Sequence, residues 1–563
     1  MHACPPAPAA PSALRCLALL LLLALAASAP AAQPGPVRGV VWRVPADLAQ
    51  ATEDLRAMQQ AGVEAVRTGL IRDDTLLTLA DSLGLAIYQE LPLDFVSAAA
   101  LVDTLAFAER LLGEALQRAS GHPSARHFGL ARRSDTSAPR ACAFFEALAQ
   151  RAREAPGARV YYLTAFIESD RCAETVDFVL LDALDVDAPA ARVARWRAAH
   201  AVPAGLGALG TWVGPEARPG LEDPHSPESQ ARYLETHLRH LLADTTAAGR
   251  AVFVHRWRDV PVASPSPVHD LARPTAHGYG LHAAGGAARP ALAVVRGFFT
   301  DGQTTFAFPQ GAAPPAPVPW ARLLGWLVFL MLGATYALSP RFRYTVPRYF
   351  QAHGFYRDGI REGREVLLGS SIVMLLAVAL SVGILGTVVL DVLRPTAAFR
   401  LVFSALPASV QQTAVALLAQ PWMLILLLGS FYALGIALWA SLLALVSRRR
   451  HPLLPGQALM LVLWARWPLL VLLLGAMTVP SLPAPWAVRG ALLLVAVGGL
   501  VALYALIRTL YDYAAITYVP GPFVLLLALA NPMVLLALAL TLPIFALDLD
   551  ALATFAWHLA RRE

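Results

Sequence analysis

The chain has 563 residues, of which 57% are hydrophobic and 15% are charged. It is too long for one ordinary domain and too apolar to lie wholly in water, so we expect part of it to lie in lipid. All 45 basic residues are arginine; from Val318 onward 17 arginines accompany 8 acidic residues, whereas the preceding part has 28 arginines and 31 acids. A basic membrane part joined to a mildly acidic part suits anionic lipid better than nucleic acid, and we expect no nucleic-acid partner.

The first 32 residues have the pattern of a secretory signal peptide. Arg15 precedes an apolar run from Leu17 to Ala26, and small residues follow around Ala29. The run is too short for a comfortable membrane span, so we expect residues 1–32 to direct export and to be removed. No lipobox cysteine follows the run.

Residues 33–307 alternate β-rich runs with amphipathic helical runs. The eight strand candidates read, in order, RGVVWRV, VEAVRTGL, GLAIYQELPLD, ARHFGLARRSD, RVYYLTAFI, VDFVLLDAL, VPAGLGALGTWV and RAVFVHRWRDV. Helices are expected at 46–61, 74–83, 97–118, 138–153, 188–200 and 227–243. The alternation predicts an α/β fold with a parallel sheet, and eight units favour a closed (β/α)8 TIM barrel; an open doubly wound sheet is the alternative.

Two cysteines remain after the signal peptide, Cys142 and Cys172. An exported protein enters a compartment that permits disulfides. Cys142 is expected near the first turn of the helix after the fourth strand, and Cys172 in the loop after the fifth strand. Both positions lie at the C-terminal end of the barrel, so we predict that the two cysteines pair; two buried thiols are the alternative.

Residues 308–319 are rich in proline and alanine and are typical of a linker that cannot form a core. The remaining part, 320–563, is predicted to be an all-α polytopic membrane domain with about six spans. The apolar stretches run over 320–338, 366–390, 422–446, 457–479, 490–508 and 522–546. Residues 396–420 are less apolar, and we expect an amphipathic helix on the outer surface there, with a poor seventh span as the alternative.

Arginine clusters at 341–364 and 448–450 fall on the same side of the predicted membrane. The positive-inside rule makes that side cytoplasmic, and the signal peptide independently places the barrel outside. We therefore expect a multi-pass protein of a bacterial inner membrane with its barrel in the periplasm or beyond.

Arg466 lies within an apolar stretch, beside Pro468. A charge inside a span is costly and points to a function by default. The alternative is that Pro468 breaks the helix and Arg466 extends to the interface between Trp464 and Trp467.

The stretch DLRAMQQAGVEAVRTGLIRDDTLLTLADSLGLAIYQE, residues 54–90, resembles the barrel of glycoside hydrolase family 2, the group of β-galactosidases and β-glucuronidases. The matching positions are Met58, Gly62, Arg67, Leu83 to Leu85, Glu90, His122 to Ser124, Trp257 and the segment 279–292. The resemblance covers about 260 residues by our alignment and implies a TIM barrel that handles sugars. The five spans after the cytoplasmic arginine segment weakly resemble a Yip1-like membrane domain, in span count and topology only.

The resemblance also implies where a catalytic pair would lie. Retaining glycosidases use two carboxyl groups about 5–5.5 Å apart. The family's acid/base ends strand four, where this chain has Arg133, and its nucleophile lies on strand seven, where our alignment places Ala208. A guanidinium cannot exchange a proton at neutral pH, so both catalytic positions are expected to be degenerate.

Other acids are candidates for a relocated catalytic pair, namely Glu90, Asp94, Asp135, Glu168, Asp182 and Glu216. Candidates for contact with a sugar are Arg67, Glu90, Arg133, Asp182, Trp212, Trp257 and Asp259. The alternatives are structural: a bracing role for Arg67, barrel-core positions for the two tryptophans, and pairing of Arg132 and Arg133 with Asp135 or Glu168. No metal-site pattern is present and no cofactor is expected.

These expectations favour a membrane-anchored, glycosidase-like barrel that binds envelope or extracellular glycan. The preferred carbohydrate partner is an acidic glycan, because guanidinium groups bind carboxylates through paired hydrogen bonds; membrane lipid is a second partner, and protein partners are not indicated. One alternative is an active O-glycosyl hydrolase that uses relocated acids. Another is a component of glycan or lipid-linked sugar transport, or a scaffold.

Overall fold

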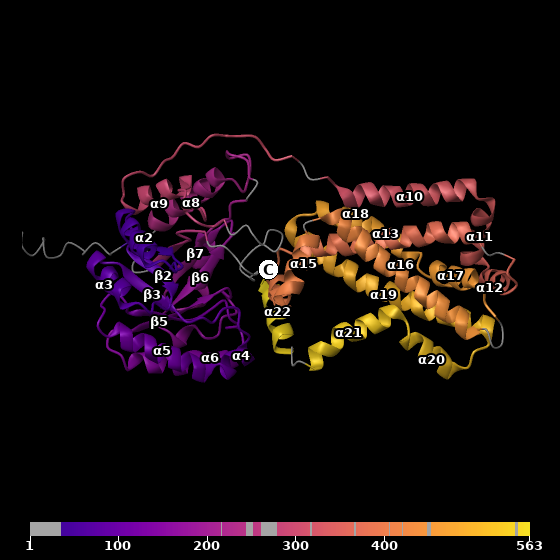
Figure 1. The fold of residues 1–563 in the computed structure, drawn as a ribbon, viewed down its shortest axis with the longest axis horizontal. Helices are drawn as coiled ribbons and strands as arrows, with labels where there is room; N and C mark the ends of the chain where they lie inside the picture. The colour runs from indigo at the N-terminus through magenta and orange to yellow at the C-terminus, as the bar shows by residue number, and fades with distance from the viewer. Residues whose placement is uncertain are drawn as a thin grey trace, which may run out of the picture.

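The computed structural model describes residues 35–562 except 215–216, 244–250, 260–277, 316–317, 365–366, 405, 419, 448–451 and 547–549. The expected signal peptide and Glu216 lie outside the described residues. An N-terminal barrel and a C-terminal bundle of helices make up the described chain (Figure 1).

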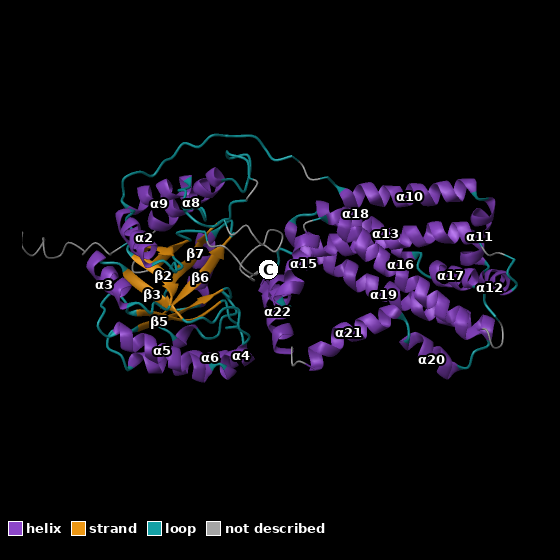
Figure 2. Cartoon of the chain, viewed as in Figure 1, coloured by secondary structure: helices purple, strands orange, loops and turns teal. Residues whose placement is uncertain are grey.

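The barrel is closed by eight parallel strands in sequential order (Figure 2). The strands are β1 (Val37–Val41), β2 (Ala65–Gly69), β3 (Ala86–Glu90), β4 (His127–Arg132), β5 (Arg159–Thr164), β6 (Phe178–Leu184), β7 (Ala204–Gly210) and β8 (Ala251–His255). Strand β1 pairs with both β2 and β8, which closes the sheet. The predicted (β/α)8 barrel is confirmed.

The helices of the barrel are α2 (Leu48–Gln60), α3 (Asp74–Leu83), α4 (Ala98–Asp103), α5 (Leu105–Ala119), α6 (Pro139–Arg153), α7 (Pro189–Ala199), α8 (Pro227–Ala243) and α9 (Pro290–Phe299). The single helix expected at 97–118 is in fact two, α4 and α5. They meet at Thr104, whose hydroxyl donates to the carbonyl oxygens of Ala100 and Leu101. A threonine side chain that bonds to the backbone in this way competes with helix continuation.

Two apolar layers follow from the alternation of side chains along each strand. The larger layer packs the strands against the surrounding helices. The smaller layer fills the barrel interior with Ala65, Tyr88, Tyr161, Leu163, Leu180, Ala251 and Phe253. Two residues further along their strands, the interior rows continue with Arg67, Glu90, Asp182 and His255. The interior is therefore apolar towards the N-terminal ends of the strands and charged at their C-terminal ends, where barrel enzymes have their active sites.

The second half is a helical bundle. Four of its helices are long and apolar enough to cross a membrane: α10 (Trp320–Leu338), α13 (Leu368–Leu393), α16 (Pro421–Ser447) and α19 (Ala484–Thr517). Two bent pairs bring the number to as many as six, α17 (Pro455–Trp464) with α18 (Pro468–Thr478), and α20 (Gly521–Leu529) with α21 (Pro532–Ala546). Helices α11 (Pro340–Gln351) and α12 (His353–Arg361) connect α10 to α13.

The segment expected to hold one amphipathic helix at 396–420 contains two short ones, α14 (Ala397–Ser404) and α15 (Ala408–Leu418). Pro407 separates them, as proline disfavours helix in the residue before it. Neither is long enough to be a candidate span.

The last helix, α22 (Asp550–Arg562), brings the end of the chain back to the barrel. Its Phe555 and Leu559 pack with Leu401 of α14 and with Phe166, which follows β5. Its His558 contacts Asp135 and Ser137, which follow β4. Helices α14 and α22 therefore lie between the C-terminal ends of the barrel strands and the bundle (Figure 1).

Candidate site at the barrel mouth

Glu90 is the acid at the centre of the charged layer. It ends β3, and only 3% of its side chain is exposed. Its Oε1 lies 3.5 Å from Nη1 of Arg67 on β2, and it accepts a hydrogen bond of 3.4 Å from the hydroxyl of Tyr161. Gly129 makes room for it, because a Cβ there would lie 2.8 Å from Cγ of Glu90.

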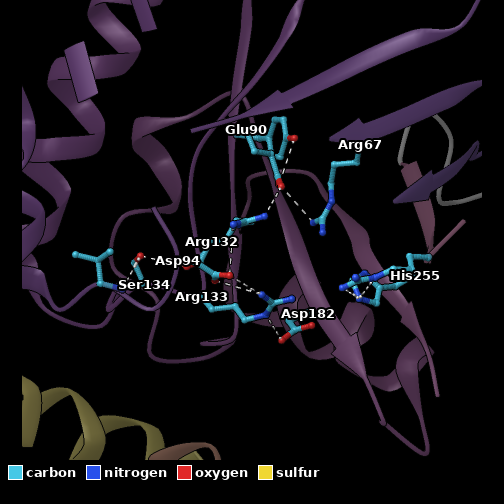
Figure 3. Close-up of polar contacts among 11 residues, drawn as sticks. Arg67, Glu90, Asp94, Arg132, Arg133, Ser134, Asp182 and His255 are labelled. Carbon is cyan, nitrogen blue, oxygen red and sulfur yellow. Dashed lines mark hydrogen bonds and ion pairs between the residues drawn. The ribbon is translucent and has the colours of Figure 1, made fainter. Parts of the chain in front are cut away.

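Two consecutive arginines at the end of β4 extend this network (Figure 3). Arg132 Nη1 lies 3.4 Å from Oε2 of Glu90, and its Nη2 lies 3.5 Å from Asp94. Arg133 binds Asp182 of β6 through Nε at 3.0 Å and Asp94 through Nη1 at 3.2 Å. The guanidinium of Arg133 thus joins two carboxylates that come from different strand ends.

The backbone conformation of Arg133 explains why its guanidinium and that of Arg132 both reach Asp94. Arg133 has a φ of 48°, in the left-handed region that residues other than glycine rarely adopt. Its side chain is 4% exposed and packs over the ring of Phe95. Burial lowers the pKa of Arg133, but the charges of Asp182 and Asp94 outweigh it and raise the pKa above its ordinary value. The group is a permanent cation and no proton donor.

Arg256 is a further cation at the mouth, directly after β8. Its guanidinium donates to Nε2 of His255 at 3.2–3.3 Å. It forms no ion pair with any carboxylate that the structure describes. Burial lowers the pKa of Arg256 to about 10, with Asp259 opposing the shift and Arg133 adding to it. Because Arg256 forms no ion pair with a described carboxylate, its guanidinium is suited to bind an incoming anion.

Arg67 lies deepest in the layer and is 1% exposed. Within the described chain, its Nε and Nη1 donate no hydrogen bond. Its Nη1 faces Glu90 at 3.5 Å, within ion-pair reach but without a hydrogen bond. Buried N–H groups that donate no hydrogen bond are costly, so an oxygen-bearing ligand or a solvent molecule would stabilise them. Gly207 of β7 permits this position, since a Cβ there would lie 2.9 Å from Nη1 of Arg67.

Other predicted site residues lie elsewhere. Asp135 is 3% exposed and faces α22, where it pairs with His558 at 3.1 Å. Glu168 is 64% exposed and pairs with Arg195 at 3.5 Å. The alternative that Arg132 and Arg133 pair with Asp135 or Glu168 is therefore wrong, because their partners are Glu90, Asp94 and Asp182. The backbone of Arg133 is in the left-handed region, so the chain turns there, and the side chains of Arg133 and Asp135 point in different directions.

One of the two aromatic candidates is buried, and the other has one face covered. Trp257 is 1% exposed and belongs to the apolar layer between strands and helices. Trp212 stacks on His225 with ring centroids 3.6 Å apart, which covers one of its faces. Asp259 forms an ion pair with Arg289 and accepts from the backbone N–H of Gly280. Trp257 is therefore too buried to stack on a sugar, whereas the sugar contacts of Trp212 and Asp259 stay predictions.

Ala208, the position aligned with the nucleophile, is fully buried in β7 and lies opposite Asp182 of β6 in register. Strand β7 has the sequence AGLGALG and carries no acid. Cys142 and Cys172 form a disulfide with their Cα atoms 4.8 Å apart, the pairing that the sequence predicted.

Arg466 lies at the bend between α17 and α18 and is 5% exposed. Its Nε donates to the hydroxyl of Tyr432 at 3.1 Å, and Nη1 donates to the carbonyl of Val462. Trp464 is also buried in the bundle. The helix breaks before Pro468, as the alternative for this residue held, and the acceptors of Arg466 lie inside the bundle. Whether Arg466 extends to a membrane interface stays a prediction.

The sequence analysis missed Arg256 as a site residue. The signal was its place directly after the last strand, where a side chain faces the mouth. In the described residues, no group of three or more His, Cys, Asp and Glu side chains is arranged to hold a metal ion.

Comparison with known proteins finds no match among protein-family models and none among curated proteins. Similar solved structures include a family-2 β-galacturonidase from Eisenbergiella tayi bound to galacturonate, at 14% identity and a TM-score of 0.43, covering 48% of this chain and 52% of that one. A β-glucuronidase from an uncultured Clostridium has 16% identity and a TM-score of 0.42, covering 47% and 50%. One from Dictyoglomus thermophilum has 14% identity and a TM-score of 0.42, covering 49% and 52%. The chain spans about half the length of each, and at these values the likeness concerns the barrel fold only.

Proposed function

We propose that the barrel binds an acidic glycan at its C-terminal face and does not hydrolyse it by the two-carboxylate mechanism. The observation that carries the proposal is the set of guanidinium groups gathered at the mouth. Arg67, Arg132 and Arg133 lie there with Glu90, Asp94 and Asp182, and Asp185, directly after β6, accepts a hydrogen bond from the hydroxyl of Tyr279. Arg256 alone among these arginines forms no ion pair with a carboxylate that the structure describes. A carboxylate of a uronic acid would supply the missing anion, and guanidinium binds it with two parallel hydrogen bonds.

The same geometry argues against hydrolysis. A glycosidase needs one carboxyl that carries a proton and one that acts as nucleophile or base. Each of the three carboxylates at the mouth lies against at least one guanidinium. Each is therefore already engaged as an acceptor for a guanidinium of the barrel itself. Ala208 and Arg133 offer neither function at the two aligned positions.

An active hydrolase is the second candidate, because Asp94 and Asp182 do meet at the mouth. They approach through one shared guanidinium, that of Arg133. If a substrate displaced Arg133, these two acids would form the relocated pair. Turnover of nitrophenyl uronides by the full-length protein, abolished in Asp182→Asn, would support this candidate.

We propose further that the helical half anchors the barrel to the outer face of a bacterial inner membrane. The arginine-rich helices α11 and α12 lie at the end of the bundle remote from the barrel (Figure 1). This arrangement agrees with the positive-inside rule if the barrel is exported. Because Arg466 has its acceptors within the bundle, we assign it to packing and do not place it on a transport path.

Binding of oligogalacturonate and of neutral cello-oligosaccharide to the full-length protein in detergent tests the proposal. Calorimetric titration should detect the acidic oligosaccharide and not the neutral one. Equal binding of both would contradict a role for the guanidinium groups. Binding should also weaken with added salt, because the contact is between charges.

A further inference from the structure

A cavity of about 670 Å³ lies beside the barrel mouth, between the loops after β4 and β5, helix α7 and the last helix α22. Its polar lining includes Arg171, Arg192, Arg195, Glu168, Ser169 and His558. It is separate from the network around Glu90 and Arg67, none of whose side chains lines it. Arg192 touches that network through the backbone carbonyl oxygen of Asp182, and no described contact joins Arg171 or Arg195 to it.

The lining has more available cations than anions. Arg171 is exposed, and among the described residues no carboxylate pairs with it. Arg192 donates to the backbone carbonyl oxygen of Asp182 and to no carboxylate within the described chain. Only Arg195 has an acidic partner, Glu168, in a solvent-exposed pair of the kind that contributes little.

The remaining acid of the lining, Asp170, does not offset these charges at the cavity surface. It is 5% exposed, and its carboxylate accepts hydrogen bonds from the hydroxyls of Thr136 and Tyr162. Burial raises the pKa of Asp170, while these hydrogen bonds oppose the shift. Its oxygen atoms therefore face the barrel core, and an anion in the cavity would meet mainly guanidinium groups.

The cavity also lies close to the outer end of a candidate span. Helix α13 ends at Leu393, and α14 begins at Ala397. Helix α22 packs on α14 through Phe555 and Leu559, and His558 beside them lines the cavity. Helices α14 and α22 therefore connect the end of the candidate span to the cavity wall.

We propose that this cavity binds a phosphate group. Three guanidinium groups from two elements can surround a doubly charged tetrahedral oxyanion, and arginine suits phosphate because of its fixed, planar set of donors. The volume admits a phosphate with a small polar substituent, such as glycerol or a sugar. The phosphate can belong to a lipid headgroup at the adjoining membrane surface or to a soluble ester.

Calorimetric titration of the full-length protein with sn-glycerol 3-phosphate in dodecyl maltoside, which carries no phosphate, tests the site. We expect saturable binding that falls at least tenfold in the double variant Arg171→Gln/Arg195→Gln. Both side chains are exposed, so the fold should be kept, as unchanged thermal unfolding would show. The matched control is Arg197→Gln, on the same helix as Arg195 but outside the cavity, and it should bind like the unchanged protein.

Absence of binding, or equal affinity in the double variant, would overturn the proposal. The source is resolved by repeating the titration in nanodiscs of phosphatidylglycerol. A loss of glycerol 3-phosphate binding there means that the headgroup occupies the cavity, whereas unchanged affinity means that the cavity takes the soluble ester. Arg256→Gln should leave this binding unchanged, which separates the cavity from the proposed glycan site.

Discussion

Arg133 and Asp182 form an ion pair of 3.0 Å across the mouth of the barrel, and only 4% and 14% of their side chains are exposed. The pair links the end of β4 to β6 and passes over β5, which lies between them in the sheet. The same guanidinium also holds Asp94. Arg133 is thus the residue that holds these strand ends together.

Replacing Arg133 with methionine should destabilise the barrel strongly. The substitution removes the ion pair of Asp182 with Arg133 and one of the two ion pairs of Asp94, which keeps Arg132. Breaking a buried pair in this way costs about 3 kcal/mol. Chemical unfolding of the full-length protein, followed by tryptophan fluorescence, measures the change in the free energy of unfolding. The control is Arg151→Met, whose side chain is 54% exposed and pairs with the exposed Glu154; it should change by less than about 1 kcal/mol.

Removing the disulfide should also destabilise the barrel. Cys142 and Cys172 are 30 residues apart and join α6 to the loop after β5. Loss of such a link costs about 2–5 kcal/mol, because the unfolded chain regains its freedom. Cys142→Ser/Cys172→Ser should therefore unfold at a lower temperature than the oxidised protein. A midpoint equal to that of the oxidised protein would contradict this prediction.

The unfolding free energy should fall as the pH is lowered from about 6.5 towards 4. Burial, with a smaller contribution from Arg159 and against the effect of Asp177, lowers the pKa of His127 from 6.5 to about 4. The ring stacks on Tyr88 at 4.0 Å in the barrel interior. In this pH window the unfolded chain binds the proton and the folded chain does not, so stability is present above 6.5 and is lost below it. The loss approaches roughly 3 kcal/mol.

The pH dependence can be assigned to this histidine with one variant. In His127→Gln the fall in unfolding free energy between pH 6.5 and pH 4 should become much shallower. An unchanged slope would show that other groups cause it.

Residue 348 should be cytoplasmic. Arg348 lies on α11, at the end of the bundle remote from the barrel. A cysteine introduced at this position should resist an impermeant thiol reagent in intact cells and react once the membrane is opened. Ready labelling in intact cells would reverse the proposed topology. Position 151 on the barrel, tested in the same way, should label without permeabilisation.

The architecture of the barrel could be predicted because its pattern is local. Helix α3 was expected at 74–83 and runs over Asp74–Leu83, and α8 was expected at 227–243 and runs over Pro227–Ala243. Both amphipathic patterns lie between short β-rich runs. The disulfide followed from the same logic, since the loops after β4 and β5 are neighbours in any sequential barrel.

The candidate site was harder to predict because its contacts depend on the directions of side chains at strand ends. Trp257 follows β8 by two residues, and we considered it as an aromatic platform at the mouth. It belongs instead to the outer apolar layer between strands and helices. Asp135 follows Arg133 by two residues, yet the left-handed turn at Arg133 directs the two apart. The contact of α22 with the barrel joins His558 to Asp135, 423 positions apart in the sequence. A local sequence pattern cannot predict such a contact.

The affinity of the full-length protein for oligogalacturonate, compared between the unchanged protein and Arg256→Gln, tests the central claim most directly. Arg256 has no carboxylate partner in the described structure, so its removal should cost little stability and should remove one charge-assisted contact to the ligand. Such a contact is worth about 1.5–3 kcal/mol, so the dissociation constant should rise at least about tenfold. The control Arg151→Gln, on the outer surface of α6, should leave it unchanged. Equal affinity in Arg256→Gln, or release of galacturonate during the titration, would contradict the account.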